Sequence, residues 1–388
     1  MRKTGVVVIG GDYQGLGVIR SLGRRGIPVY LLDSGACIGM ASKFTTRFFR
    51  CPSLEDENLF LEFLLSLAEE EKLNKWVVYP TDDETVKALS INKRLLEKYY
   101  RIPTPGWTVS QILYNKKLTY KLAEKIDIDI PRTAYPKDIN EVSQIDLCFP
   151  VIVKPVSQGR FYQKTKKKAL KARDKTELIK IYKKTGALLD SSEIMIQEVI
   201  TGGPENLFSF CSLFKEGIPL AKLVARRSRQ HPMDFGRAST FVETVDIPEL
   251  EELGTKFLNA INYYGLSEVE FMWDPRDKRY KLLEINARTW GWHTLGGIAG
   301  VDFPLLLFKD LMGKEVRNNS FRKGVKWIRI LTDAPLGFKE ILKGKLMIND
   351  YLLSLKGEKE YAVWSLKDPL PFVMEFLLLP YLWKTRGF

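Results

Sequence analysis

Hydrophobic and polar positions alternate most clearly in two short runs, residues 267–274 and 280–288, separated by a polar segment that contains Pro275. A period of two indicates β-strands, and a Pro/Asp/Lys cluster suits a reversal of the chain, so the pattern predicts a β-hairpin. Successive side chains on a strand point to opposite faces. The second run is thus predicted to place Leu282, Glu284, Asn286 and Arg288 on one face and Leu283, Ile285 and Ala287 on the other.

The polar face of this hairpin gathers groups that are costly to bury without partners. Glu270, Glu284 and Asn286 supply the oxygen ligands that Mg²⁺ prefers, and Mn²⁺ accepts the same ligands. Arg288 supplies a planar fork for a phosphate or a carboxylate. An edge hairpin whose polar face meets water would show the same pattern, so the hairpin alone leaves both interpretations open.

The N-terminal pattern alternates strands with a helix. The apolar run Val6–Ile9, a glycine-rich turn, a helical segment and the run 28–33 are typical of a βαβ unit. The glycines are spaced G-G-x-x-x-G-x-G, which does not match the dinucleotide fingerprint, so we expect a Rossmann-like domain without a dinucleotide. A buried strand at 76–80 ends before Asp82 and Asp83, which would face a cleft or cap the next helix.

Further runs place basic and polar residues at the ends of elements. Lys154 ends a β-branched run immediately before a proline, where a strand would hold its ammonium group rigidly. Another strand-like run at 220–225 is followed directly by a segment that contains Arg227 and Arg229. Arginines at the end of a strand beside an acidic hairpin predict a cleft for anions. No aromatic-interleaved basic stripe accompanies them, so we expect no nucleic-acid partner.

Composition narrows the class of protein. The 388 residues exceed one ordinary core, and 45% hydrophobic with 28% charged residues is typical of soluble globular domains. A net charge of +13 suits anionic nucleotides, acidic substrates or an anionic membrane without choosing among them. Four dispersed cysteines and two histidines argue against a zinc site, a disulfide framework and histidine relays. With no signal-peptide pattern, the chain is predicted to be cytoplasmic.

The order of these motifs resembles that of the ATP-grasp superfamily, in particular a branch of predicted carboxylate-amine ligases to which D-aspartate ligase is also similar. The resemblance implies an α/β and α+β architecture. It consists of a Rossmann-like pre-ATP-grasp domain at 1–110, a two-lobed ATP-grasp domain at 111–315 and a small C-terminal extension at 316–388. The two lobes would span about 111–195 and 196–315.

The resemblance also implies roles for individual residues. Nucleotide contacts would come from Lys116, Lys154, Gln197, Glu198, Ile200 and Glu205, with Glu198 and Ile200 at adenine and Glu205 at the ribose. Magnesium would bind Glu270, Glu284 and Asn286, while Arg227, Arg229 and Arg288 would serve the γ-phosphate, a substrate carboxylate or the transition state. Outside the resemblance, a solvated helix lysine is the default for Lys116 and an exposed turn residue for Glu205.

The implied function is an ATP-dependent ligase that converts a carboxylate to an acyl phosphate and couples it to an amine, with amino acids among the candidate substrates. No protein nucleophile is needed. The family's glycine-rich lid corresponds to residues 157–163, which contain a single glycine and precede a lysine run reaching Lys175. Either these lysines substitute electrostatically, or the chain is a catalytically weak nucleotide sensor or scaffold.

The C-terminal segment 370–388 is apolar but shorter than the roughly 20 residues that cross a bilayer, and Glu375 and Pro380 interrupt it. Its aromatic residues, with Lys384 and Arg386, suit a segment lying on the anionic inner face of a membrane. The alternative is a tail docked on the protein's own core or on the second subunit of a homodimer.

Overall fold

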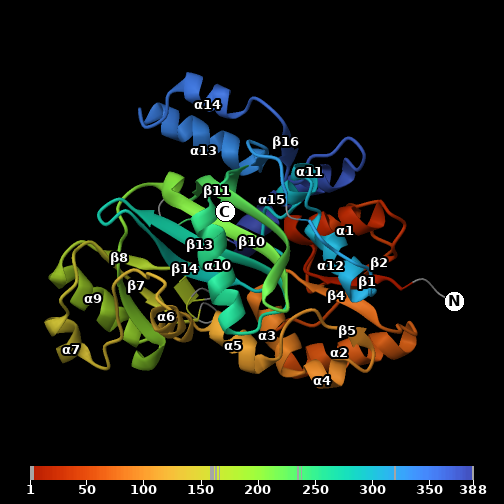
Figure 1. The fold of residues 1–388 in the computed structure, drawn as a ribbon, viewed down its shortest axis with the longest axis horizontal. Coiled ribbons are helices and arrows are strands. Elements are labelled where there is room, and N and C mark those ends of the chain that lie inside the picture. Colours follow the sequence, from red (N-terminus) through yellow and green to blue (C-terminus); the bar gives the residue numbers. More distant parts are fainter. Residues whose placement is uncertain are drawn as a thin grey trace.

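The residues that the computed structural model describes form three β-sheets with flanking helices, which confirms the predicted mixed α/β class (Figure 1). These are residues 4–386 except 158–160, 162–163, 166, 234–235, 237 and 319, with side chains described as far as Tyr381. Most of the predicted lid, residues 157–163, therefore lies outside the described residues.

The N-terminal sheet is parallel, with the order β3-β2-β1-β4-β5, and helices cover both of its faces. Its central strands β1 and β4 are continuous apolar runs because both of their faces are buried. The Rossmann-like prediction is thus confirmed. Its elements are β1 (Val6–Ile9), α1 (Tyr13–Gly23), β2 (Val29–Asp33), β3 (Arg47–Arg50), α2 (Glu57–Glu70), β4 (Trp76–Pro80), α3 (Asp83–Ile91), α4 (Lys93–Leu96), β5 (Tyr100–Arg101) and α5 (Trp107–Tyr114).

A small antiparallel sheet of order β6-β9-β7-β8 follows, at the left of Figure 1. Val151 and Val153 on one face of β7 pack against Leu178 and Tyr182 of helix α9. Lys154 therefore points to the other face, as predicted from the alternation. The elements are α6 (Lys116–Lys125), β6 (Thr133–Ala134), α7 (Ile139–Gln144), β7 (Val151–Pro155), β8 (Leu170–Ala172), α9 (Lys175–Gly186) and β9 (Ile194–Glu198).

The large central sheet has the order β14-β13-β10-β11-β12-β15-β16. Both faces of β10 are buried, because α10 covers one face while α11 and α12 cover the other and join it to α1 of the N-terminal domain. The elements are β10 (Leu207–Lys215), β11 (Ile218–His231), β12 (Ala238–Thr244), α10 (Pro248–Ala260), β13 (Gly265–Asp274), β14 (Arg279–Asn286), α11 (Thr294–Ala299), α12 (Phe303–Leu311), β15 (Lys326–Ile328) and β16 (Lys359–Tyr361). Strands β15 and β16 come from the C-terminal extension, which thereby completes this sheet.

The predicted hairpin is β13–β14, with Glu270 opposite Glu284. The predicted alternation of Leu282 and Leu283 is wrong, because the register shifts between Glu270 and Phe271. Phe271 consequently pairs with Leu282, which lies in the hydrophobic core, whereas Leu283 lies beside Glu284 in the lining of a cavity. A β-bulge of this kind moves every following side chain to the opposite face.

The C-terminal extension continues with α13 (Ile330–Leu342) and α14 (Ile348–Ser354), which project from the body of the molecule at the top of Figure 1. Helix α15 (Leu370–Arg386) packs on the short helix η1 (Ile38–Ala41) of the N-terminal domain. Its buried Glu375 forms an ion pair with Arg329, whose Nη2 lies 3.1 Å from Oε1. The inner face of the tail is therefore docked on the protein. None of the described helices combines the length and the hydropathy needed to cross a bilayer.

Candidate functional site

A cavity of about 390 Å³ lies between the small sheet and the large sheet. Strands β7 and β9 contribute one wall, and β11, β13 and β14 contribute the other. The predicted site residues in its lining are Lys116, Lys154, Gln197, Glu198, Ile200, Arg227, Glu270 and Glu284. Glu205, Arg229, Asn286 and Arg288, which the structure also describes, are outside this lining.

Two carboxylates from the hairpin lie on one wall, because β13 and β14 pair Glu270 with Glu284. Glu270 accepts a 3.0 Å hydrogen bond from Asn286 Nδ2 and forms an ion pair with Arg227. The same Asn286 Nδ2 donates to Glu268 Oε2 at 2.9 Å. Burial, with repulsion from Glu270, raises the pKa of Glu268 to about 7. Glu268 is thus a buried neighbour of the predicted metal ligands that the motif comparison did not select, although its alternation with Glu270 pointed to it.

Lysines face these carboxylates. Lys116 Nζ lies 2.9 Å from Glu284 Oε2. Burial opposes ionisation of Glu284, but Lys116 and Lys168 outweigh this effect and hold the pKa of its carboxyl well below the usual range. Lys168 also lines the cavity, together with Lys171. The lysine run that follows the predicted lid therefore contributes two residues to the cavity, where they could act on phosphates electrostatically.

Lys154 donates a hydrogen bond from its Nζ to Tyr120 Oη at 3.4 Å. Burial, together with the positive charge of Lys116, lowers the pKa of Lys154 to about 7. A bound phosphate next to this group would favour its charged form. Lys154 is thus a buried lysine whose charged form an anionic ligand would stabilise.

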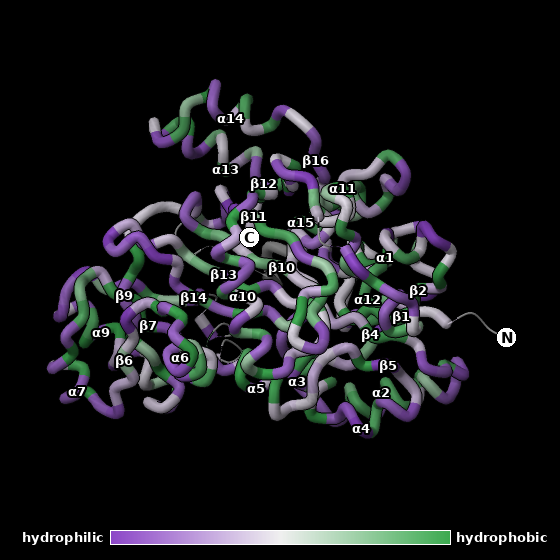
Figure 2. Tube along the Cα trace, in the orientation of Figure 1, coloured by the Kyte–Doolittle hydropathy of each residue, from purple (hydrophilic) through white to green (hydrophobic). Residues whose placement is uncertain are grey.

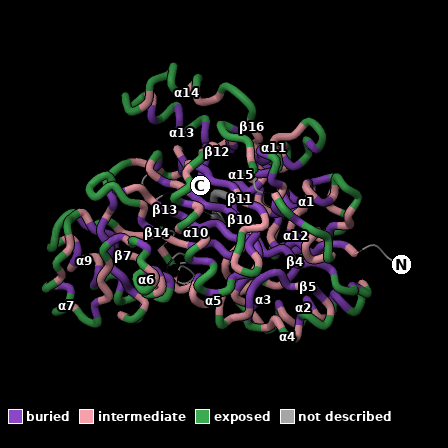
Figure 3. Tube along the Cα trace, viewed as in Figure 1, coloured by how far each residue is buried: buried purple, intermediate pink, exposed green. Residues whose placement is uncertain are grey.

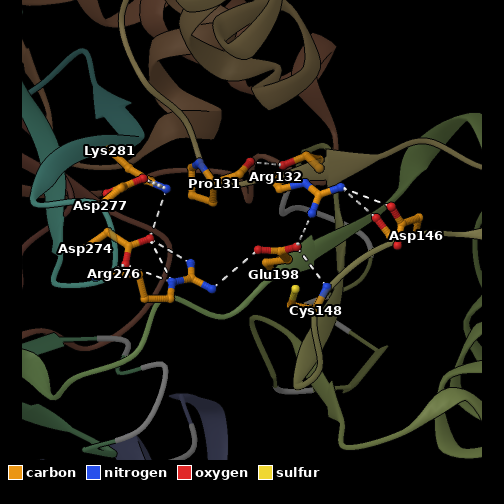
Figure 4. Close-up of polar contacts among 10 residues, drawn as sticks. Pro131, Arg132, Asp146, Cys148, Glu198, Asp274, Arg276, Asp277 and Lys281 are labelled. Atoms are coloured by element: carbon orange, nitrogen blue, oxygen red, sulfur yellow. Dashed lines mark hydrogen bonds and ion pairs between the residues drawn. The ribbon is translucent and has the colours of Figure 1, made fainter.

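The strand β9 supplies the wall on which the motifs place adenine. The side chain of Gln197 donates to Tyr120 Oη at 3.1 Å and to Thr133 Oγ1 at 2.8 Å. The carboxylate of Glu198 is held by Arg132 at 3.3 Å and Arg276 at 3.5 Å (Figure 4). Both side chains are thus engaged by the protein, so hydrogen bonds from this strand to a purine edge are left to the main chain.

Glu205 lies on an exposed turn, where its Oε1 accepts a 3.1 Å hydrogen bond from the backbone N–H of Gly203.

Arg288 reaches the N-terminus of α3, where its Nε donates to Asp83 Oδ1 at 2.7 Å. It also donates to Asn286 Oδ1 at 3.0 Å, so it remains linked to the carboxylate cluster. Asp82 caps α3 by accepting from Thr85, as expected for one of the two roles proposed for it.

Arg227 and Arg229 point in opposite directions although they are two residues apart on β11. The pairing of β11 with β12 shifts between Arg226 and Arg229, so the regular alternation is lost there. Arg229 is consequently buried against Asp333, with Nε to Oδ1 and Nη2 to Oδ2 both at 2.8 Å. The structure brings Arg227 to the cavity and Arg229 to the C-terminal extension.

The donor chemistry of the cavity fits a nucleotide with its magnesium ion. The described residues contain no group of three or more His, Cys, Asp or Glu arranged to hold a metal. Mg²⁺ normally takes only one or two carboxylates from the protein and shares the rest of its shell with phosphates and water. Glu270 and Glu284 match that requirement, and the surrounding lysines and Arg227 match the phosphates.

Comparisons with known proteins agree with this geometry. Residues 225–314 match the family model of the carbamoyl-phosphate synthase L chain, ATP binding domain. A D-aspartate ligase from Enterococcus faecium (strain Aus0004) is 27% identical over 259 residues, and the match covers 61% of this chain and 59% of that enzyme's length.

Two solved structures show the same fold. An L-amino acid ligase from Bacillus licheniformis has a TM-score of 0.63 at 16% identity, covering 80% of this chain and 75% of that one. An N5-carboxyaminoimidazole synthetase from Staphylococcus aureus has a TM-score of 0.61 at 17% identity, covering 83% of this chain and 80% of that one.

Proposed function

We propose that this chain is an ATP-grasp protein and an ATP-dependent ligase that joins a carboxylate to an amine, because of its similarity to the family model, the D-aspartate ligase and the L-amino acid ligase structure described above. The observation that carries the proposal is the opposition of charges across the cavity. Glu270 and Glu284 lie on one wall, and Lys116 and Lys154 come from the facing lobe. An anionic triphosphate and its divalent cation together complement both walls.

Each residue has a distinct task in this proposal. Lys154 and Lys116 hold phosphate oxygens, which replace Glu284 as the partner of Lys116 when the nucleotide enters. Glu270 and Glu284 would hold Mg²⁺ together with the phosphates, and the ion would supply positive charge for phosphoryl transfer. Asn286 fixes the carboxylate of Glu270 through its Nδ2–H, and Arg227 limits the motion of the same carboxylate from the other side.

The acceptor carboxylate would attack the γ-phosphate to give ADP and an acyl phosphate, and the amine would then displace phosphate from the acyl carbon. Arg288, which is linked to the carboxylate cluster through Asn286, would stabilise the transition state. The relatives named for D-aspartate and L-amino acids support an amino acid as one of the two substrates.

The test is ADP release by the purified protein with Mg-ATP and a panel of amino acids and small carboxylates, alone and in pairs. A ligase shows ADP release that requires one acid and one amine, and mass spectrometry then identifies the amide product. ATP binding without any substrate-dependent ADP would overturn the proposal and favour the nucleotide sensor.

A further inference from the structure

The α13–α14 hairpin has an unusual surface composition. Its outer side carries large apolar side chains that are more than half exposed, namely Phe338 (63%), Leu342 (72%), Met347 (68%), Ile348 (59%), Leu352 (53%) and Leu353 (55%). Figure 3 shows the hairpin standing clear of the body, with α14 largely exposed. Figure 2 shows hydrophobic positions along both helices. Soluble proteins seldom leave so many large apolar side chains together in water.

The inner side of the hairpin buries polar residues beside Leu336. Asp333 of α13 is fully buried and receives both 2.8 Å hydrogen bonds from Arg229. Arg229 Nη1 also donates to Ser354 Oγ of α14 at 3.0 Å, and Tyr351 Oη lies 3.3 Å from Asp333 Oδ2. An ordinary surface hairpin turns most of its large apolar side chains inward, whereas six of them are more than half exposed here. The ion pair between Arg229 and Asp333, the ionic anchor, fixes the helices to the large sheet, while their exposed apolar side chains point away from the protein.

The two helices also approach each other closely. A Cβ at Gly337 would lie 2.4 Å from the ring of Tyr351, so only glycine allows this packing of α13 on α14. The exposed apolar residues are thus presented by a fixed pair of helices and not by a loosely held end.

Positive charge accompanies the apolar residues. Residues 338–357 contain the lysines Lys339, Lys343, Lys345 and Lys356, against two acids. One of these acids, Glu340, is buried and pairs with Lys343 at 3.0 Å. Self-association through this surface would bring the lysines of two copies together, which is electrostatically unfavourable. An anionic lipid surface would attract the same lysines and accept the apolar side chains between them.

We propose that the α13–α14 hairpin docks this protein on an anionic membrane surface. Leu342, Met347 and Ile348, which border the turn between the helices, enter the boundary between headgroups and acyl chains, and the neighbouring lysines contact lipid phosphates. Arg229 is the anchor that transmits this attachment to the large sheet. The proposal is independent of the ligase activity and places the membrane contact on a different segment from 370–388.

The test is sedimentation of the full chain with vesicles of phosphatidylcholine alone or with about one third phosphatidylglycerol. We expect binding only to the anionic vesicles, weakened at high salt. The triple variant Leu342→Ser/Ile348→Ser/Leu352→Ser should lose binding by about tenfold or more, because it removes apolar area that enters the lipid. Lys339→Gln/Lys343→Gln/Lys345→Gln should remove most of the salt dependence.

A matched control is Val373→Ser/Leu377→Ser on α15, whose side chains are 52% and 70% exposed. It should bind vesicles like the parent, and all variants should keep the parent's thermal midpoint and ATP affinity. Absence of parent binding to anionic vesicles, or loss of binding in the α15 control but not in the triple variant, would overturn the proposal. A parent dimer in light scattering that the triple variant dissociates would also overturn it, in favour of a second copy as the partner.

Discussion

Arg227 and Arg229 belong to two regions that treat buried charge in different ways. In the cavity, Lys116 pairs with Glu284 and Arg227 pairs with Glu270, while Lys154 donates to Tyr120 and the lining leaves room for a ligand. At the base of the C-terminal extension, Arg229 and Asp333 satisfy each other completely inside the protein. The first group of charges borders a cavity that a ligand could enter, as expected of a functional site, whereas the charges of the second group are enclosed by the protein, as expected of a structural pair.

The largest effect is expected in the cavity, for the substitution Glu284→Gln. We expect ADP release to fall by about a hundredfold or more, because one metal charge is lost while the fold is retained. Thermal stability should fall less than when a fully buried ion pair is broken, because the paired side chains of Lys116 and Glu284 border the cavity and are 12% and 19% exposed. A Glu284→Gln protein with the parent's activity and Mg²⁺ dependence would remove this residue from the metal site.

The opposite result is expected for Asp333→Asn, which leaves Arg229 buried without its partner charge. Breaking a buried ion pair costs about 3–5 kcal/mol, so urea unfolding should shift by a large fraction of the total stability. ATP affinity of the folded fraction should persist. The double variant Arg229→Leu/Asp333→Leu should recover part of the lost stability. If Asp333→Asn instead abolished ATP binding in a fully folded protein, Arg229 would belong to the nucleotide site.

Lys154→Met should weaken ATP binding by about tenfold, because it removes a phosphate partner and keeps the packing of the stem. In the free protein burial lowers the pKa of Lys154 to about 7, and a phosphate would raise it again. Binding therefore takes up a proton above pH 7, and affinity should fall as the pH rises from 7 to 9. Titration calorimetry in two buffers of different ionisation enthalpy would detect this proton, and Lys154→Met should abolish it.

The smallest effect is expected for Glu205→Ala. Its carboxylate is exposed and engaged by the backbone of Gly203, outside the lining of the cavity. Surface substitutions of this kind usually change stability by no more than about 0.5 kcal/mol, and we expect less than about a threefold change in KM for ATP. A much larger rise in KM, seen with ATP but not with an analogue that lacks the ribose hydroxyls, would support the role at the ribose.

The sequence was sufficient for the features that depend on regular periodicity. The period-two pattern of residues 267–288 located the hairpin, and the β-branched run before Lys154 located its strand and face. Periodicity fails where a strand gains an extra residue. The bulge beside Leu283 and the shift near Arg229 each change the faces that follow, and neither of these two residues is next to a glycine or a proline in the sequence.

The extension 316–388 was beyond sequence reasoning for a different reason. Its strands are short, and their partners lie far away in the chain, as when Val242 pairs with Trp327. Its helices also carry apolar residues on the side that faces solvent, so the usual assignment of apolar residues to the core gives the wrong face for Phe338 and Leu342. Glu268 was not selected because the motif used for the comparison contains Glu270 and not its neighbour. Glu268 is tied to the site by the hydrogen bonds that its carboxylate accepts from Ser209 and Asn286.

The addition of β15 and β16 to the large sheet has a practical consequence for anyone who wishes to shorten this protein. Cutting the chain after the region that matches the family model, residues 225–314, would leave β12 without the partner that pairs Phe241 to Glu243. An unpaired strand edge is a template for association with other chains. A fragment ending near residue 315 should therefore precipitate, and the shortest well-behaved form of this protein should retain at least β16.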